Sequence, residues 1–180
     1  MGPTEGTPQV LKCGIIGAGI AGLAAAIALR RAGHEVELFE KSTFKNEIGA
    51  AITLTPNSML VLDKWAFDEK KAGSTEKQQS RILDPETLEL KVHIDLTDVR
   101  DKFGHGFAAF HRVDLHEEMR RMARELGVEV SLGKQAVAVD CEGGVVGFKD
   151  GGEVKKDLMI VADGIKVGRE SGQHESCCCA

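Results

Sequence analysis

Three glycines and one acidic residue in the first forty positions have the types and spacing to bind a dinucleotide. Gly17, Gly19 and Gly22 lie in the sequence GAGIAG, and Glu40 follows 18 residues after Gly22. A glycine lets a pyrophosphate approach the backbone, and the N–H groups and positive dipole end of a following helix attract the phosphates. A carboxylate accepts hydrogen bonds from the hydroxyls of an adenosine ribose. The pattern therefore predicts a site for the ADP half of a dinucleotide.

Each glycine of this motif has its own expected role. Gly17 permits the sharp exit of the chain from a strand, Gly19 leaves room for the pyrophosphate, and Gly22 lets the helix pack tightly on the sheet. Glu40 would repel a 2′-phosphate, so we expect the site not to hold NADP. Two other interpretations stay open on this unit alone: a Gly-rich turn that only packs a helix on a strand, and an NAD-dependent dehydrogenase.

The sequence around the motif supplies the elements that such a site requires. Residues 10–16 are mostly apolar, as in a central parallel strand. Residues 20–32 are rich in good helix formers and are followed by Gly33, which is typical of a helix end. Residues 35–40 alternate apolar and polar side chains and predict a second strand. Strand, turn, helix and strand together give the motif its required context.

Later segments predict further helices and strands. A helix begins at Pro56, and another runs over 114–126 with Asp114 as its N-cap. The apolar run 158–161 indicates a buried strand that ends beside a possible ligand. The other expected strands are a hairpin of 81–83 and 88–94, then 128–132, 136–139, 145–148 and 153–154. This alternation of helices and strands predicts an α/β fold.

Composition and charge exclude several classes of function. The formal net charge is −5 and no basic cluster occurs, so we expect no nucleic-acid partner. No apolar run reaches the roughly 18 residues that span a bilayer, and the polar N-terminus lacks the apolar region of a signal peptide. We therefore expect a cytoplasmic protein with no stable membrane association. The six histidines show no metal-ligand spacing, so we expect no metal site.

Four stretches between residues 10 and 166 share a further pattern. They are GAGIAGLAAAIALRRAGHEVELFEK, EIGAAITLTPNSMLVLDKW, FHRVDLHEEM and DLMIVADGIK. Together they resemble the FAD-dependent aromatic hydroxylases, the single-component flavin monooxygenases that include salicylate hydroxylase. The resemblance implies an α/β fold with a Rossmann-like, FAD/NAD(P)-binding parallel sheet of the glutathione-reductase type and an incomplete β-rich substrate domain. Residues 10–166 would form the N-terminal part of the FAD-binding domain, with 78–110 contributing to a partial substrate domain.

The resemblance also implies which residues bind the FAD. They are Gly17, Ala18, Gly19, Ile20, Ala21, Gly22, Glu40 and Lys41 from the first stretch, Gly49 and Ala50 from the second, Arg112 from the third, and Asp163 and Gly164 from the last. Without the resemblance, the better interpretation of Arg112 is a surface arginine paired with Asp114 or Glu117. Asp163 would then be no more than the start of a common Asp-Gly turn.

The implied reaction needs no catalytic acid, base or metal from the chain, because the cofactor performs the difficult chemistry. NAD(P)H would reduce the flavin, and oxygen would then be delivered to a small aromatic substrate. Two alternatives stay open beside this FAD-dependent monooxygenase. One is another FAD- or NAD-linked oxidoreductase with the same opening unit, and the other is a truncated FAD-binding fragment without turnover. The oligomeric state is not indicated by the sequence.

Residues 167–180 depart from the family pattern. They show no apolar period and no helix or strand signal, so we expect an unstructured tail that does not belong to the family. Because valine codons begin with GT, as intron donor sites do, our hypothesis is that the reading frame runs past an exon end after Lys166. An alternative is prenylation, since the terminal sequence CCCA formally fits C-a-a-X.

Overall fold

The structure, a computed structural model, describes residues 9–44 and 49–164. The chain divides into two compact units. Unit 1 comprises residues 1–46 and 120–180, and unit 2 comprises residues 47–119. The hypotheses about the tail 167–180 lie outside the described residues and stay predictions.

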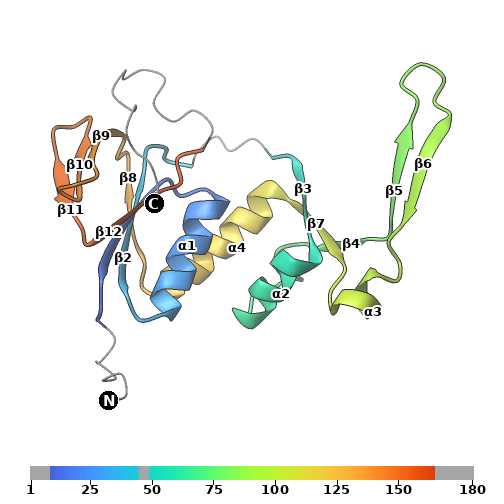
Figure 1. Ribbon diagram of the computed structural model, residues 1–180, viewed down its shortest axis with the longest axis horizontal. Helices are drawn as coiled ribbons and strands as arrows, with labels where there is room; N and C mark the ends of the chain where they lie inside the picture. The colour runs from blue at the N-terminus through green and yellow to red at the C-terminus, as the bar shows by residue number, and fades with distance from the viewer. Residues whose placement is uncertain (1–8, 45–48, 165–180) are drawn as a thin grey trace, which may run out of the picture. The chain divides into compact units, whose positions relative to one another are not determined.

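Unit 1 is built on a four-stranded parallel sheet with the strand order β12-β1-β2-β8 (Figure 1). Its strands are β1 (Lys12–Ile16), β2 (Glu35–Glu40), β8 (Glu129–Leu132) and β12 (Leu158–Val161). All three pairings are parallel, and β1 is paired on both sides, which explains why its apolar residues are buried. The sheet confirms the predicted α/β class and the first two predicted strands.

Helix α1 (Ile20–Arg31) connects β1 to β2 and packs on both strands. Five alanines and two leucines favour the helix, and its buried face includes Leu23, Ala26 and Ile27. The helix ends as predicted, because Gly33 adopts a φ of 92° and donates its N–H to the carbonyl oxygen of Arg30. The predicted strand, turn, helix and strand are thus all present.

A small antiparallel sheet of β9 (Ala136–Asp140), β10 (Val145–Phe148) and β11 (Glu153–Lys155) completes unit 1. It packs on the parallel sheet through an apolar cluster that contains Ile16, Phe39, Val146 and Phe148. The rings of Phe39 and Phe148 are tilted at 44° with their centroids 4.9 Å apart, which is a favourable aromatic geometry.

The prediction that residues 158–161 form a buried strand is wrong in its burial. β12 forms at these residues and pairs with β1, but it lies at the edge of the sheet. Leu158 and Val161 are 38% and 50% exposed, and the two residues between them are half-buried. A continuous apolar run does not distinguish a central strand from an edge strand, because pairing on the second side decides the burial.

Unit 2 contains a three-stranded antiparallel sheet with the order β3-β7-β4. Its strands are β3 (Ala51–Leu54), β4 (Thr75–Lys77) and β7 (Phe107–His111). Helix α2 (Pro56–Lys64) begins at the predicted proline, buries Met59 and Leu62, and packs on β7 and on α3 (Val99–Phe103). Strands β4 and β7 and helix α3 were not expected from the sequence.

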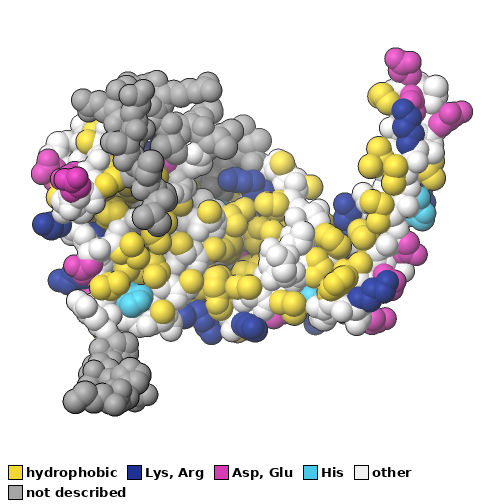
Figure 2. Space-filling view, in the orientation of Figure 1, with side chains coloured by type: hydrophobic (Ala, Val, Ile, Leu, Met, Phe, Trp, Pro, Cys, Tyr) yellow, Lys and Arg dark blue, Asp and Glu magenta, His cyan; other side chains and the backbone are white. Residues whose placement is uncertain are grey.

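The predicted hairpin is present as β5 (Gln79–Leu83) and β6 (Leu90–Asp95), which form a two-stranded ribbon (Figure 1). The polar face of this ribbon carries Gln79, Arg81, His93 and Asp95. Its apolar face carries Ile82, Leu90, Val92 and Ile94, which are 42–55% exposed. Figure 2 shows apolar side chains along this ribbon, at the right of the view. The two faces follow from the alternation of side chains along each strand, which a register shift interrupts between Ile82 and Leu83.

Helix α4 (Arg112–Glu125) begins two residues earlier than predicted. The sequence analysis placed Asp114 at the N-cap, but Asp114 lies within the first turn of the helix. The antiparallel pairing of β3 with β7 continues to His111, and the N–H of Arg112 donates to the carbonyl oxygen of Ala50 at 2.9 Å. The strand partner therefore sets the start of the helix.

Within the described residues, no helix is both long and apolar enough to cross a membrane.

One buried histidine of unit 2 lies among carboxylates. The Nε2 atom of His105 lies 2.8 Å from Oε1 of Glu69 and 3.9 Å from Oδ2 of Asp63. Its Nδ1 atom lies 2.8 Å from the carbonyl oxygen of Gly106. Burial, the largest single influence, lowers the pKa of His105, but the hydrogen bonds and the two negative charges outweigh it and raise the pKa above its ordinary value. The imidazolium form, in which both nitrogens donate, fits this place.

We expect the stability of the protein to depend on pH through His105. Because its folded pKa lies above the unfolded value of about 6.5, its contribution is fully present below about pH 6 and is lost as the pH rises through the folded pKa. The thermal midpoint of the wild type, relative to that of His105→Gln, should fall as the pH rises above the unfolded value of about 6.5. Glu69→Gln should weaken this dependence, and His93→Gln, on the exposed ribbon, should keep it. Parallel curves for wild type and His105→Gln would contradict the assignment.

Candidate functional site

The carboxyl ends of β1, β2 and β12 meet at the Gly-rich turn. Gly17 adopts a φ of 98°, and its N–H donates to the carbonyl oxygen of Phe39 at 2.8 Å. A Cβ atom at Gly17 would lie 2.5 Å from the carbonyl oxygen of Ala162, which follows β12. Both its φ and this close approach require glycine. Ligands bind at this edge in open α/β sheets, so the turn lies where a site is expected.

Gly22 and Gly19 meet different surroundings. A Cβ atom at Gly22 would lie 1.9 Å from the carbonyl oxygen of Gly17, so this glycine lets α1 pack against the turn. At Gly19, no heavy atom lies within 4 Å of the position that a Cβ atom would take. The space beside Gly19 is therefore open to a ligand, whereas the space beside Gly22 is filled by the protein itself.

The start of α1 offers donors to this open space. Gly19 is the N-cap, with φ −71° and ψ −178°, and no side chain caps the helix. The N–H groups of Ile20, Ala21 and Gly22 in the first turn have no acceptor within the helix. The first turn carries no acidic residue, so the positive end of the helix dipole is not neutralised there. These donors and this open space fit the two phosphates of a dinucleotide.

Glu40 lies at the end of β2 and is only 8% exposed. Its Oε2 atom accepts a hydrogen bond from the N–H of Ala18 at 2.7 Å, and its Oε1 atom accepts one from the N–H of Ser42 at 2.7 Å. The sequence predicted ribose hydroxyls as the partners of this carboxylate, whereas the partners within the chain are backbone groups. Each carboxylate oxygen carries a second lone pair, so the predicted contact to a ribose stays compatible with this geometry.

Asp163 and Lys41 lie at the same edge of unit 1. Ala162 donates its N–H to the carbonyl oxygen of Ile16 at 2.7 Å, and this bond extends the pairing of β12 with β1 beyond the strand. Oδ1 of Asp163 then lies 3.4 Å from Nζ of Lys41. Gly164 follows with a φ of 84°. The structure thus places the unit 1 residues of the predicted site together, and their contact with a cofactor stays a prediction.

The remaining predicted residues lie in unit 2 and are close to one another. Gly49 and Ala50 precede β3, and Arg112 follows β7, its partner strand. Within the part of the chain that the structure describes, the guanidinium of Arg112 forms no hydrogen bond or ion pair. The alternative interpretation, an ion pair of Arg112 with Asp114 or Glu117, is therefore not observed, and the guanidinium is available to a ligand.

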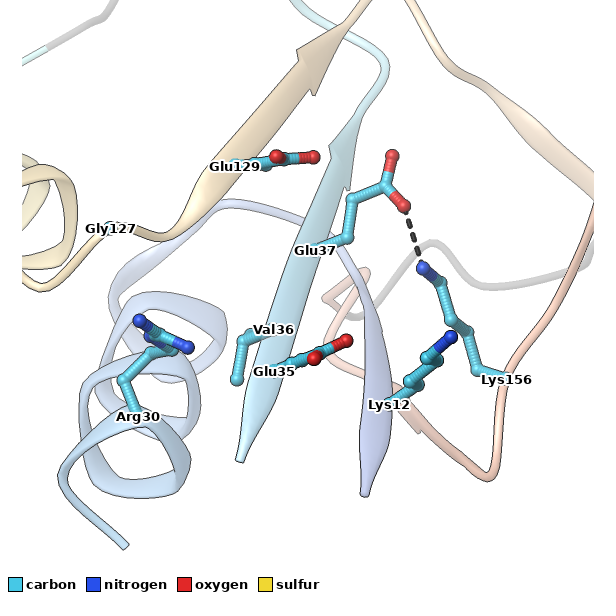
Figure 3. A pocket seen from close by; sticks show the side chains of 8 residues that line it. All are labelled: Lys12, Arg30, Glu35, Val36, Glu37, Gly127, Glu129 and Lys156. Atoms are coloured by element: carbon cyan, nitrogen blue, oxygen red, sulfur yellow. Dashed lines mark hydrogen bonds and ion pairs between the residues drawn. The ribbon is translucent and has the colours of Figure 1, made fainter. Parts of the chain in front are cut away.

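A pocket of about 190 Å³ lies at the opposite edge of unit 1, at the amino ends of the strands (Figure 3). Its charged side chains have both signs, and Nζ of Lys156 lies 2.8 Å from Oε2 of Glu37. The residues that line it are Lys12, Arg30, Glu35, Val36, Glu37, Gly127, Glu129 and Lys156. No predicted site residue is among them, and open α/β sheets bind ligands at the other edge.

The sequence analysis missed the group of Asp63, Glu69 and His105. The ligand atoms of these three residues all lie within 4.8 Å of one another, which is a spacing that a metal site would also have. Hydrogen bonding and charge within the group account for the arrangement without an ion. No sequence signal pointed to this group. Asp63 lies in α2, Glu69 in the loop after it and His105 before β7, so the three residues come together only in the folded unit.

Comparison with known proteins places the chain among flavoproteins. The family model of an NAD(P)-binding Rossmann-like domain matches residues 15–55. The FAD-dependent monooxygenase cfoG of Aspergillus candidus is 39% identical over 84% of this chain and 36% of its own length. Hispidin-3-hydroxylase of Neonothopanus nambi is 32% identical over 84% of the chain and 37% of its own length. 3-Hydroxybenzoate 6-hydroxylase of Polaromonas naphthalenivorans is 34% identical over 88% of the chain and 41% of its own length.

Solved structures of similar fold include an oxygenase and a protein in complex with FAD. The tetrameric form of 2-methyl-3-hydroxypyridine-5-carboxylic acid oxygenase superimposes with a TM-score of 0.71 at 28% identity, covering 84% of this chain and 39% of that one. A variant of HpxO from Klebsiella pneumoniae in complex with FAD gives a TM-score of 0.67 at 25% identity, covering 83% and 38%. The chain spans just over a third of the length of the curated relatives it matches. The chain is therefore similar to one part of these FAD-dependent monooxygenases and hydroxylases, and it shares their Rossmann-like fold.

Proposed function

We propose that this chain binds FAD, and that the protein to which it belongs hydroxylates a small aromatic substrate with NAD(P)H and O2. The observation that carries the proposal is the open start of α1 at Gly19, with the carboxylate of Glu40 held beside the turn. A bound flavin would supply hydride acceptance and oxygen activation, and the protein would supply binding and orientation.

The predicted site residues of unit 1 have proposed roles in binding the ADP half. The pyrophosphate would lie beside the backbone of Gly19, and the N–H groups of the first turn of α1 would donate hydrogen bonds to its oxygens. Glu40 would bind the adenosine ribose, and its negative charge would disfavour a 2′-phosphate, so FAD or NAD fits better than NADP. Asp163 and Lys41 would lie near the phosphates, with the ammonium of Lys41 balancing the carboxylate.

The residues of unit 2 would contact the rest of the cofactor. The guanidinium of Arg112 presents a planar fork of donors that suits phosphate or hydroxyl oxygens. Gly49 and Ala50 lie beside Arg112 and are exposed, so their backbone groups are accessible.

The names of the relatives support a phenolic or related aromatic substrate. They refer to 3-hydroxybenzoate, hispidin and 2-methyl-3-hydroxypyridine-5-carboxylic acid. These names share an aromatic substrate, so we propose the same class of substrate for the protein. The electron-rich ring of such a compound would be the group that is hydroxylated. We also propose a cytoplasmic location, which rests on the sequence analysis alone.

The first test is the binding of FAD. We expect the purified chain to quench flavin fluorescence with a saturable titration curve. Gly19→Val should weaken FAD binding about tenfold or more, because a side chain would occupy the place of the pyrophosphate. Its free energy of unfolding should fall by no more than about 1 kcal/mol, since the backbone angles suit any residue and only the N-cap preference is lost.

The matched control is Gly22→Ala, which adds a smaller group at a filled position. It should lower the free energy of unfolding by about 2–3 kcal/mol, as overpacking in a core does. Urea unfolding without FAD separates the two effects. Equal loss of stability in both variants, or undiminished FAD binding by Gly19→Val, would count against the proposed phosphate site.

The second test concerns Glu40. In Glu40→Gln, one of the two backbone N–H groups that the carboxylate accepts would face an amide NH2 group. We expect the free energy of unfolding to fall by about 1–3 kcal/mol and FAD binding to weaken with it. Glu35→Gln, at the amino end of the same strand, should change neither the free energy of unfolding nor FAD binding. Unfolding and fluorescence titrations would check both variants, and equal behaviour of the two would contradict the role of Glu40.

The third test concerns the reaction of the complete protein. We expect NADH oxidation by the FAD-loaded protein to be accelerated by a phenolic acid such as 3-hydroxybenzoate, with release of a hydroxylated product. Absorbance at the NADH band and chromatography of the product would measure it. Flavin binding with no response to any aromatic acid would instead favour a different FAD-linked oxidoreductase.

A further inference from the structure

The imidazole of His111 lies against the backbone of Gly49. A Cβ atom at Gly49 would lie 2.1 Å from Cε1 and 2.2 Å from Nε2 of His111. Side chains at residue 49 larger than hydrogen would therefore overlap the ring in its present place. Gly49 adopts no left-handed conformation, so the backbone itself would accept alanine. The requirement for glycine at this position is steric, and it comes from one side chain.

The same ring belongs to the residue that immediately precedes Arg112 in the chain. His111 is the last residue of β7 and pairs with Ala51, the first residue of β3. The next residue, Arg112, donates its N–H to the carbonyl oxygen of Ala50 at 2.9 Å. Gly49 and Ala50 are exposed, so burial in a core does not fix them. Within the described residues, the ring and this hydrogen bond are two contacts between the segment and the start of α4.

We propose that His111 is a positioning residue, whose ring holds Gly49 and Ala50 beside the start of α4. This inference rests on the proposed function, because the segment and Arg112 are expected to contact FAD. The ring itself needs no contact with the cofactor. It restricts the path of the two residues before β3, and their backbone groups and the guanidinium of Arg112 are then presented to the ligand together.

In the alternative interpretation, His111 is an ordinary exposed histidine. The expected effect of Gly49→Ala on FAD binding is then different. If His111 has no positioning role, Gly49→Ala simply turns the ring outward, and the binding of FAD stays unchanged. If the ring holds the segment, Gly49→Ala displaces the ring and His111→Ala removes it, and both substitutions weaken FAD binding for the same reason. The two substitutions then act through one contact, so their effects are not additive.

A double-mutant cycle on FAD binding tests the proposal. The dissociation constant of FAD would be measured by fluorescence titration for wild type, Gly49→Ala, His111→Ala and the double variant. We expect each single variant to bind FAD about tenfold more weakly, and the double variant to bind no more weakly than His111→Ala alone. His111→Phe keeps a flat ring on Gly49 and should restore most of the affinity. His93→Ala, on the exposed ribbon, should bind FAD as the wild type does.

The outcomes separate this inference from the function on which it rests. Wild type that fails to bind FAD overturns both. Wild type that binds FAD, together with additive effects of the two substitutions or undiminished binding by His111→Ala, overturns the positioning role alone. Thermal unfolding of the same variants serves as the check on folding, and an affinity loss that only follows a loss of folded protein also counts against the proposal.

Discussion

One buried carboxylate joins the turn after β1 to the end of β2, at the edge of unit 1 where we expect the ligand. The two oxygens of Glu40 accept the N–H groups of Ala18 and Ser42 at 2.7 Å each. Because Ala18 lies in the turn after β1 and Glu40 ends β2, the carboxylate joins the ends of two neighbouring strands with charge-assisted bonds. The start of α1 is thereby fixed relative to the acid. Such fixed spacing is what recognition of a pyrophosphate and a ribose in one molecule requires.

The elements around this edge were predictable because their determinants are local. Gly17, the alanine-rich helix and Gly33 lie within one stretch of chain, and each enforces its conformation through its own chemistry. The hairpin of β5 and β6 was predictable for the same reason, since the turn at Asp84-Pro85 separates two alternating strands. The position of the acid was also predictable, but its bonds to Ala18 and Ser42 were not, because they depend on the folded turn.

The features that the sequence did not reveal depend on distant partners. β7 forms because β3 and β4 pair with it from both sides, and the same pairing moves the start of α4 from Asp114 to Arg112. The exposure of β12 reflects its place at the sheet edge rather than its composition. The reason for glycine at residue 49 lies in the ring of His111, more than sixty residues away. Such long-range relations leave no periodic signal in the chain.

The amphipathic ribbon of β5 and β6 has a consequence for the dynamics of unit 2. Its two strands hydrogen-bond only to each other within the described residues, and its apolar side faces water. A lone two-stranded hairpin is marginally stable, since little apolar area is removed from solvent when it forms. We therefore expect the ribbon to open more readily than the parallel sheet, so that amide protons along residues 79–95 exchange with solvent before those of β1.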